Sequence, residues 1–382
     1  MNIMINVERL SDEFCKLAAI ASPSLHEGAI ARYLQQRFTQ LGAQVLVDEC
    51  APQINGDTGN ILALFPGSKS AAQPLLLSAH MDTVTPAIGV QPVLVDGIFR
   101  SDGTTVLGAD DKSGIAQIIE AIQCLQENAI AYPPLEVLIT VAEEVGLLGV
   151  KHFDMHRLHA KHGLVLDSTG VGTVAASSPG ANKLRFVVEG IATHAGLNPE
   201  HGLSAIQVAA KAISNMQLGR IDTETTANIG LISGGQATNI IPNYVQALGE
   251  ARSFNAEKLR CQTEHMQQCF RDAVAAQSVI DMHGEQRTAQ LRIDVDADYP
   301  AMNVDHNAEI ISNLQKAAAL VDQQLVVGSS GGGSDANIFN KQGIVVANLA
   351  TGMQKVHTVD EFIRVDDLAN VCRLLLQFIR IS

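Results

Sequence analysis

Hydrophobic and polar positions follow an alternating plan over roughly the first 175 residues. Short apolar runs are separated by segments in which apolar residues recur with a helical period. Three of these runs, PLLLSA, LEVLITVA and GLVL, lead directly into His80, Glu143 and Asp167, and a later run, GIVVANL, leads into a loop that carries His357. Strands that alternate with helices predict an α/β fold with a largely parallel sheet.

The pattern changes in the middle of the chain. There the order is strand, helix, strand, strand, long helix and strand, in the segments KLRFVVEG, HGLSAIQVAAKAISNM, TANIGLIS, VQALGEARS, AEKLRCQTEHMQQCFRDAVAA and QLRIDVD. This βαββαβ order is that of a ferredoxin-like unit. We therefore expect a catalytic domain made of residues 1–180 and 297–382, interrupted by an inserted α+β lid domain at residues 181–296. A length of 382 residues leaves room for both.

The amino-acid composition and the net charge argue against nucleic acids and membranes as binding partners. The formal net charge of -14 argues against a nucleic-acid surface, because such surfaces need clustered Lys and Arg. No apolar run approaches the roughly 20 residues that span a bilayer. The N-terminal MNIMINVERLSDEF lacks the basic and apolar regions of a secretory signal, and the six cysteines form no CxxC pair. We expect a cytoplasmic protein with neither a membrane nor a nucleic-acid partner.

Candidate metal ligands gather where the predicted strands end. His80, Glu143, Glu144 and Asp167 follow strands, and Asp110 lies in GADDKSG just before a helix. Ligands of open α/β sheets bind at the carboxyl ends of the strands. Carboxylates held this closely repel one another unless a cation neutralises them, so two divalent metals are expected. Imidazole and carboxylate ligands without a nearby cysteine favour zinc, with cobalt or manganese as alternatives.

The neighbours of these ligands suggest a division of roles. Asp82, two residues after His80, is placed to accept the second ring N–H of His80 and to fix its tautomer. Glu143 and Glu144 point in different directions on an extended segment, so one can bind a metal while the other moves protons. The alternative reading of this glutamate pair is a favourable interaction with a helix N-terminus.

The order of several motifs resembles that of one enzyme superfamily. SAHMDTVTP, GADDKSG, TVAEEVGLLG, LDS and HTVDE occur as in the zinc-dependent exopeptidases that include peptidase T, aminoacylases and glutamate carboxypeptidases. ATNIIPN, GEARS and GGGSDAN extend the match over nearly the whole chain, and the chain is most similar to the peptidase T-like branch. The resemblance implies a zinc-exopeptidase-like (phosphorylase/hydrolase-like) catalytic domain with a ferredoxin-like lid.

The resemblance also implies a set of metal ligands. In the family pattern, Asp110 bridges two divalent ions. His80 and Asp167 complete one of the two sites, and Glu144 and His357 complete the other. All five ligand positions are occupied by the expected residue types.

Roles in catalysis and substrate binding follow from the same resemblance. Glu143 matches the general base that takes a proton from the attacking water and delivers it to the leaving nitrogen. His194, in ATHAG, matches a histidine that reaches the partner subunit's active site and stabilises the oxyanion, which implies a homodimer formed through the lid. Arg252 and Asn239 match lid residues that hold the terminal carboxylate or a carbonyl of the substrate. The glycine-rich turn would present backbone N–H groups to the same end of the substrate through Gly332, Gly333 and Ser334.

These assignments lead to one function and leave two alternatives. The first expectation is a metal-dependent exopeptidase that releases the N-terminal residue of short peptides such as tripeptides. An N-acyl amino acid deacylase would use the same two metals. A metal-stabilised protein that binds peptides without cutting them is the third possibility, and the intact Glu143 argues against it. Substrate preference stays open, because relatives of peptidase T commonly have His where this chain has Phe254.

Arg252 and a histidine-rich segment can each be explained by a structural role instead of a functional one. Arg252 has Glu250 nearby in the sequence and can pair with it instead of with a substrate. The histidine-rich segment KHFDMHRLHAKHG is predicted to place His152, His156 and His159 on one face of a helix. Because no carboxylate-rich partner accompanies them, we interpret these histidines as a solvated helix face rather than a third metal site.

Overall fold

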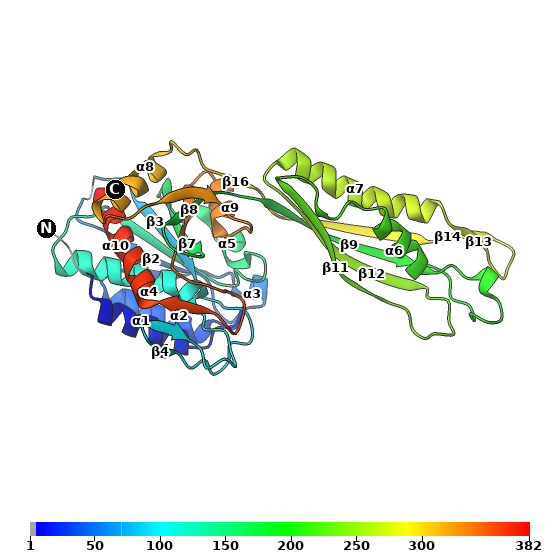
Figure 1. Cartoon of the computed structure of the whole chain (residues 1–382), viewed down its shortest axis with the longest axis horizontal. Helices are drawn as coiled ribbons and strands as arrows, with labels where there is room; N and C mark the ends of the chain where they lie inside the picture. The colour runs from blue at the N-terminus through cyan, green and yellow to red at the C-terminus, as the bar shows by residue number, and fades with distance from the viewer. Residues whose placement is uncertain (1–4, 70) are drawn as a thin grey trace. The chain divides into compact units, whose positions relative to one another are not determined.

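The chain folds into two compact units (Figure 1). The computed structural model describes residues 5–69 and 71–382. One unit combines the chain up to Ser178 with Met302–Ser382, and the other is Pro179–Ala301. Within the described residues, no helix is both long enough and apolar enough to cross a membrane.

The inserted unit is larger than the predicted lid of residues 181–296. Its first strand begins at Gly180 and its last strand ends at Tyr299. These two strands pair with each other as far as Ala181 and Tyr299, so the sheet continues beyond the apolar pattern from which the boundary was predicted. An exposed stretch in the middle of this strand, from Asp294 to Ala297, breaks the alternation of apolar and polar positions, so hydrophobicity alone did not reveal that the strand continues to Tyr299.

The unit formed by the two ends of the chain, which corresponds to the predicted catalytic domain, is built on a mixed sheet of nine strands. Eight of them follow one another along the sheet in the order β1 (Gln44–Val47), β2 (Ile61–Phe65), β6 (Leu135–Thr140), β3 (Leu75–His80), β7 (His162–Ser168), β18 (Val345–Ala350), β8 (Thr173–Ser178) and β16 (Met302–Asn303), and β17 (Val326–Ser329) pairs with β8. The neighbours β6, β3, β7 and β18 are parallel. Every residue of β3 and β6 is buried, which is typical of central parallel strands covered on both faces.

Helices pack on this sheet in two connected groups. The first group meets β3, β7 and β18, and consists of α1 (Val7–Ala19), α4 (Ala109–Glu127), α8 (Glu309–Leu320) and α10 (Val365–Ile381). The second group includes α9, which packs on β18 and β7, and consists of α3 (Ala51–Ile54), α5 (Leu148–His152) and α9 (Asp335–Lys341). Helix α2 (Gly28–Gln40) packs on β1 and β2. A separate small sheet is formed by β4 (Val93–Val95), β5 (Ile98–Arg100) and β19 (Phe362–Arg364).

The lid is an antiparallel sheet with two helices. Its strand order is β10-β11-β12-β9-β15, and its elements are β9 (Gly180–Glu189), α6 (Ala205–Ser214), β10 (Gly219–Arg220), β11 (Thr225–Gly234), β12 (Tyr244–Ser253), α7 (Ala256–Ala275) and β15 (Gln290–Tyr299). A short hairpin of β13 (Ser278–Ile280) and β14 (Gln286–Thr288) precedes β15. The four long strands have the order of a ferredoxin-like sheet, so the predicted fold class is confirmed.

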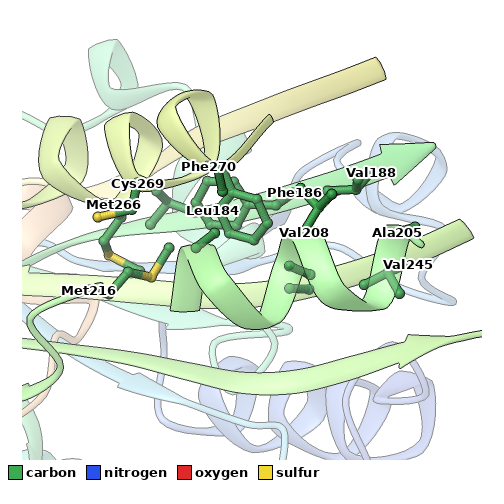
Figure 2. Packing of buried hydrophobic residues seen from close by; sticks show 14 of the residues in the cluster. Leu184, Phe186, Val188, Ala205, Val208, Met216, Val245, Met266, Cys269 and Phe270 are labelled. Carbon is green, nitrogen blue, oxygen red and sulfur yellow. The ribbon is translucent and has the colours of Figure 1, made fainter. Parts of the chain in front are cut away.

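Alternating apolar positions give the lid its own core. Leu184, Phe186 and Val188 point from β9 toward the helices, as Figure 2 shows. The rings of Phe186 and Phe270 stack with their centroids 4.1 Å apart. Helix α7 begins at a true cap, because the side chain of Asn255 accepts hydrogen bonds from the first backbone N–H groups of the helix. The lid therefore has the local signals and the buried core of an independent packing unit.

Candidate metal centre

The carboxyl ends of the parallel strands bring the predicted ligands together. His80 ends β3, and Asp167 lies near the end of the neighbouring strand β7. Glu143 was expected to follow β6 directly, but β6 ends at Thr140, and Ala142 has a φ of 50°. The chain therefore turns before it reaches the glutamates. Even so, both glutamates line the same cavity as Asp167.

Asp110 occupies the centre of the cluster. Its Oδ1 lies 3.1 Å from Nε2 of His80, and its Oδ2 lies 3.2 Å from Nε2 of His357. Oδ1 of Asp167 lies 3.7 Å from Nε2 of His80, and Oε1 of Glu144 lies 3.0 Å from Nε2 of His357. One carboxylate thus faces two different imidazoles with its two oxygens.

The donor set fits two divalent cations. The ligand atoms of His80, Asp110 and Asp167 lie within 4.8 Å of one another, and so do those of Asp110, Glu144 and His357. Each group offers one imidazole and two carboxylates, which suits zinc and its neighbours in the first transition series. The five predicted ligands are therefore arranged as two overlapping sets that share Asp110.

The close packing of acids and imidazoles shifts their pKa values. Burial raises the pKa of Asp167 to about 7 and also raises the pKa of Glu144. Hydrogen bonds to Asp110 and Glu144 raise the pKa of His357 to about 10. Burial opposes ionisation of Asp110, but hydrogen bonds from His357 and His80 outweigh it and lower the pKa of Asp110. The cluster gathers three carboxylates around two imidazoles, and a bound cation would balance their negative charge.

Asp82 faces both His80 and the segment that carries the two glutamates. The Nδ1 atom of His80 lies 3.0 Å from the backbone oxygen of Asp82 and 3.4 Å from its carboxylate, so the backbone is the closer partner. The Asp82 carboxylate also accepts hydrogen bonds from the backbone N–H groups of Glu143 and Glu144, at 3.0 and 3.2 Å. It also accepts the hydroxyl of Ser24 at 2.7 Å. One buried carboxylate therefore positions the segment that carries both glutamates.

Two buried glutamates, neither of which was predicted as a site residue, hold backbone N–H groups beside the cluster. Glu361 accepts hydrogen bonds from the N–H groups of Gly108 and Asp110, at 2.7 and 2.9 Å, and fixes the backbone at Asp110. Glu27 accepts the N–H of Ala142 at 2.9 Å. Burial raises the pKa of each of these two carboxyls to about 7. Glu361 is the last residue of the HTVDE motif, so the motif could have identified it as a site residue. No motif in the sequence points to Glu27.

A cavity of about 180 Å³ opens beside the predicted ligands. Glu143 lies on its wall, is 9% exposed, and has a pKa that burial raises well above its ordinary value. Gly333 and Ser334 also line the cavity. Two of the backbone N–H groups expected to face the substrate are already used within the protein, because Gly332 donates to Ser330 and Ser334 donates to Asn337.

The predicted catalytic histidine and substrate-binding residues of the lid form two local groups. His194 forms an isolated bridge with Ile240, and the backbone oxygen of Asn239 accepts the N–H of Ala195 at 2.9 Å, so His194 and Asn239 lie on neighbouring segments. The His194 side chain is exposed, and its Nδ1 accepts the N–H of Gly196 at 3.1 Å.

Arg252 forms the second group. It donates two hydrogen bonds of 3.0 Å to the carboxylate of Glu250. This ion pair within the chain is the alternative to substrate binding that the sequence suggested for Arg252.

The histidine-rich segment does not form the helix face that was predicted. Helix α5 ends at His152, and a separate 3-10 turn spans Met155–Arg157. Phe153 and Leu158 are buried, whereas His152, His156 and His159 are exposed. The buried apolar residues anchor an irregular segment, so a helical period does not apply to these histidines.

Comparison with known proteins gives one family for most of the chain. The sequence signature of peptidase family M20/M25/M40 matches residues 76–381. An uncharacterized protein of Bacillus subtilis (strain 168), YqjE, is 39% identical over 377 residues, which cover 98% of this chain and 99% of that protein. The structure is similar to that of aminopeptidase PepT from Bacillus cereus ATCC 10987, with a TM-score of 0.89, 39% identity and 99% of each chain covered. It is also similar to a tripeptidase from Staphylococcus aureus subsp. aureus Mu50, with a TM-score of 0.92, 36% identity and 99% of each chain covered.

Proposed function

The chain belongs to peptidase family M20/M25/M40 and is a metal-dependent exopeptidase of short peptides, and we propose that it releases the N-terminal residue of tripeptides. The observation that carries the proposal is Asp110, whose two oxygens each face a different imidazole. A shared carboxylate of this kind suits a pair of cations that act on one substrate bond. The similar aminopeptidase and tripeptidase structures support the choice of substrate.

Zinc is the metal proposed for both positions, with cobalt and manganese as alternatives. His80, Asp110 and Asp167 would hold one ion, and Asp110, Glu144 and His357 would hold the other. Bound ions of this type polarise the scissile carbonyl and lower the pKa of water. The choice of zinc rests on the ligand types, since each set combines one imidazole with carboxylates.

Glu143 is the proposed general base and acid. Its carboxylate lies on the cavity wall, next to the ligands but outside both ligand sets. It accepts a proton from the attacking water and returns it to the departing nitrogen. Asp82 keeps this carboxylate in place by holding the backbone N–H of Glu143. His194 is proposed to stabilise the negative charge that develops on the carbonyl oxygen.

The proposed substrate-binding groups act at the ends of the peptide. Arg252 suits a terminal carboxylate because a guanidinium binds it with two parallel hydrogen bonds. Since Arg252 is paired with Glu250, binding of a substrate carboxylate would exchange one acidic partner for another. Asn239 and the turn of Gly332, Gly333 and Ser334 are proposed to hold the remaining polar groups of the peptide.

A homodimer formed through the lid is also proposed. Strand β11 pairs with β12 along one edge, and β10 covers only Thr226 and Ala227 on the other. Leu231 is 66% exposed and Ile232 is 55% exposed on this strand. An open edge with exposed apolar side chains is favourable for pairing with a second copy. A reducing cytoplasm is the proposed location, in keeping with six free cysteines.

Substrate competition tests the proposed activity. The metal-loaded protein is offered a tripeptide, the same tripeptide with an acetylated N-terminus, and an N-acetyl amino acid, and the products are identified by mass spectrometry. We expect release of the N-terminal residue from the free tripeptide alone. Glu143→Gln is the control, which should keep the metals and lose turnover. Turnover of only the acetylated amino acid would replace the peptidase assignment with the deacylase, and metal binding without any turnover would favour the peptide-binding protein.

A further inference from the structure

A bulge separates the paired strands β7 and β18 beside the metal ligands. Asn348 of β18 pairs with Val165 of β7, but the next paired positions are Ala350 of β18 and Ser168 of β7. One extra residue of β7 therefore stands in the gap, and the ladder is interrupted around Asp167. Bulges of this kind turn a side chain out of the regular direction of a strand and are common beside active sites.

The side chain of Asn348 replaces the interrupted ladder. Its Oδ1 accepts the backbone N–H of Asp167 at 3.0 Å, and its Nδ2 donates to the backbone oxygen of Asp167 at 2.9 Å. Asn348 is 3% exposed, and its amide is the hydrogen-bond partner of both backbone groups of Asp167. Loss of the amide would leave these groups without this partner. The amide thereby fixes the backbone from which the Asp167 carboxylate points toward His80.

The same amide reaches the glycine-rich turn. Nδ2 of Asn348 donates a second hydrogen bond, of 3.1 Å, to the hydroxyl of Ser334. Ser334 caps helix α9 and lines the cavity together with Asp167 and Asn348. One buried side chain therefore touches both a metal ligand's backbone and the turn proposed to bind the substrate.

We propose that Asn348 is a positioning residue that couples the substrate-binding turn to the metal ligand Asp167. When a substrate moves Ser334, the Asn348 amide transmits the movement to the backbone of Asp167. Conversely, a metal that fixes Asp167 also restrains the glycine-rich turn through the same amide. This inference rests on the proposed two-metal peptidase function, and it concerns only the ligand set that contains His80 and Asp167. The set that contains Glu144 and His357 has no contact with Asn348 among the hydrogen bonds of the described residues.

The test compares Asn348→Ala with Asn340→Ala. Asn340 is a matched control because its amide also ties α9 to β18, with bonds to the backbone oxygens of Ala336 and Val346, but it does not line the cavity. Metal affinity is measured by competition with a chromophoric chelator, and KM and kcat are measured with a tripeptide. Loss of an outer contact to a ligand typically weakens metal binding about 10- to 100-fold.

We expect Asn348→Ala to weaken one of the two metal sites by about 10- to 100-fold and to raise KM, whereas Asn340→Ala leaves both sites within about threefold of the original chain. Ser334→Ala breaks the same contact from the other side, and it should weaken the same site several-fold even if Asn348→Ala does not fold. Equal weakening of both sites, or equal effects of the Asn348 and Asn340 substitutions, would overturn the inference. Absence of metal binding or turnover in the unaltered chain would instead overturn the proposed function.

Discussion

Asp82 shows how a single carboxylate acts on the site through the backbone. Its two oxygens accept the N–H groups of Glu143 and Glu144, while His80 is held mainly by the Asp82 backbone oxygen. In Asp82→Asn, one side-chain oxygen becomes an NH2 group, so either orientation of the amide sets a donor against a backbone N–H. We expect kcat to fall by about 10- to 100-fold while metal content stays unchanged, because the His80 contact is retained.

Steady-state kinetics and elemental analysis check this prediction. Ser24→Ala is the control, because it removes one hydrogen bond to Asp82 without introducing a donor. That variant should remain within about threefold of the original kcat. Equal losses in the two variants would show that the backbone contacts of Asp82 have no special role.

Protonation of single ligands predicts how metal affinity depends on pH. Without metal, the pKa of Asp167 is raised to about 7 by burial, and that of His357 is raised to about 10 by its hydrogen bonds to Asp110 and Glu144. Both groups hold protons at pH 6, and a bound cation must displace them. Metal affinity should therefore increase with pH by about tenfold per unit for each proton released, with a smaller slope above pH 7, where Asp167 is already ionised.

Chelator competition at pH 6, 7 and 8 measures this slope for zinc or cobalt. Hydrogen bonds with Asp110, Asp167 and Asp82 outweigh burial and also raise the pKa of His80 well above its ordinary value, so His80 releases a proton to a metal as well. His357→Ala should therefore reduce the slope above pH 7 without abolishing it. An affinity that does not change between pH 6 and pH 8 would contradict the assignment of Asp167 and His357 as ligands.

At the scale of elements, the close approach of α4 to β7 depends on one glycine. An added Cβ at Gly114 would lie 2.4 Å from the backbone oxygen of Leu166, which cannot move aside as a flexible side chain can. Alanine favours a helix over glycine by about 1 kcal/mol, whereas overpacking typically costs about 1–3 kcal/mol. We expect Gly114→Ala to lower the free energy of unfolding and to weaken metal binding, because α4 carries Asp110 and β7 carries Asp167.

Denaturant unfolding of the metal-free chain and chelator competition measure the two effects. Gly230→Ala is a suitable control, since its Cβ would meet only a side-chain nitrogen of Asn228, at 3.6 Å. A Gly114→Ala chain that is as stable as the Gly230→Ala chain and binds metal as tightly as the original would show that this approach tolerates a methyl group.

Local patterns predicted most elements, and tertiary contacts account for the differences. The alternating positions of β9 and the period of α7 are visible in the sequence, because each element buries one face in the same core. The histidine-rich segment was wrongly predicted as a helix, because buried Phe153 and Leu158 decide its path. Glu27 and Asn348 could not be recognised, since their partners lie 115 and 181 residues away in the chain.

At the scale of the whole molecule, the proposed dimer makes each active site depend on two chains. If His194 acts across subunits, a His194→Ala chain still supplies Glu143 and a Glu143→Ala chain still supplies His194. Free mixing places about half of the chains in mixed dimers, and one of the two sites in each mixed dimer has both residues. We therefore expect the mixture to recover up to about a quarter of the original activity, although each variant alone is nearly inactive.

Tripeptide turnover by the mixture, after exchange of subunits, measures this recovery. A third substitution separates dimerisation from catalysis: Ile232→Lys places a charge on the exposed edge of β11, where 55% of Ile232 is accessible. A lysine on an edge strand opposes pairing with another strand. When Ile232→Lys is added to both chains, the recovery should disappear and the sedimentation coefficient should fall to that of a monomer. Recovery that persists in monomers would contradict the lid interface, and no recovery in dimers would place His194 in the active site of its own chain.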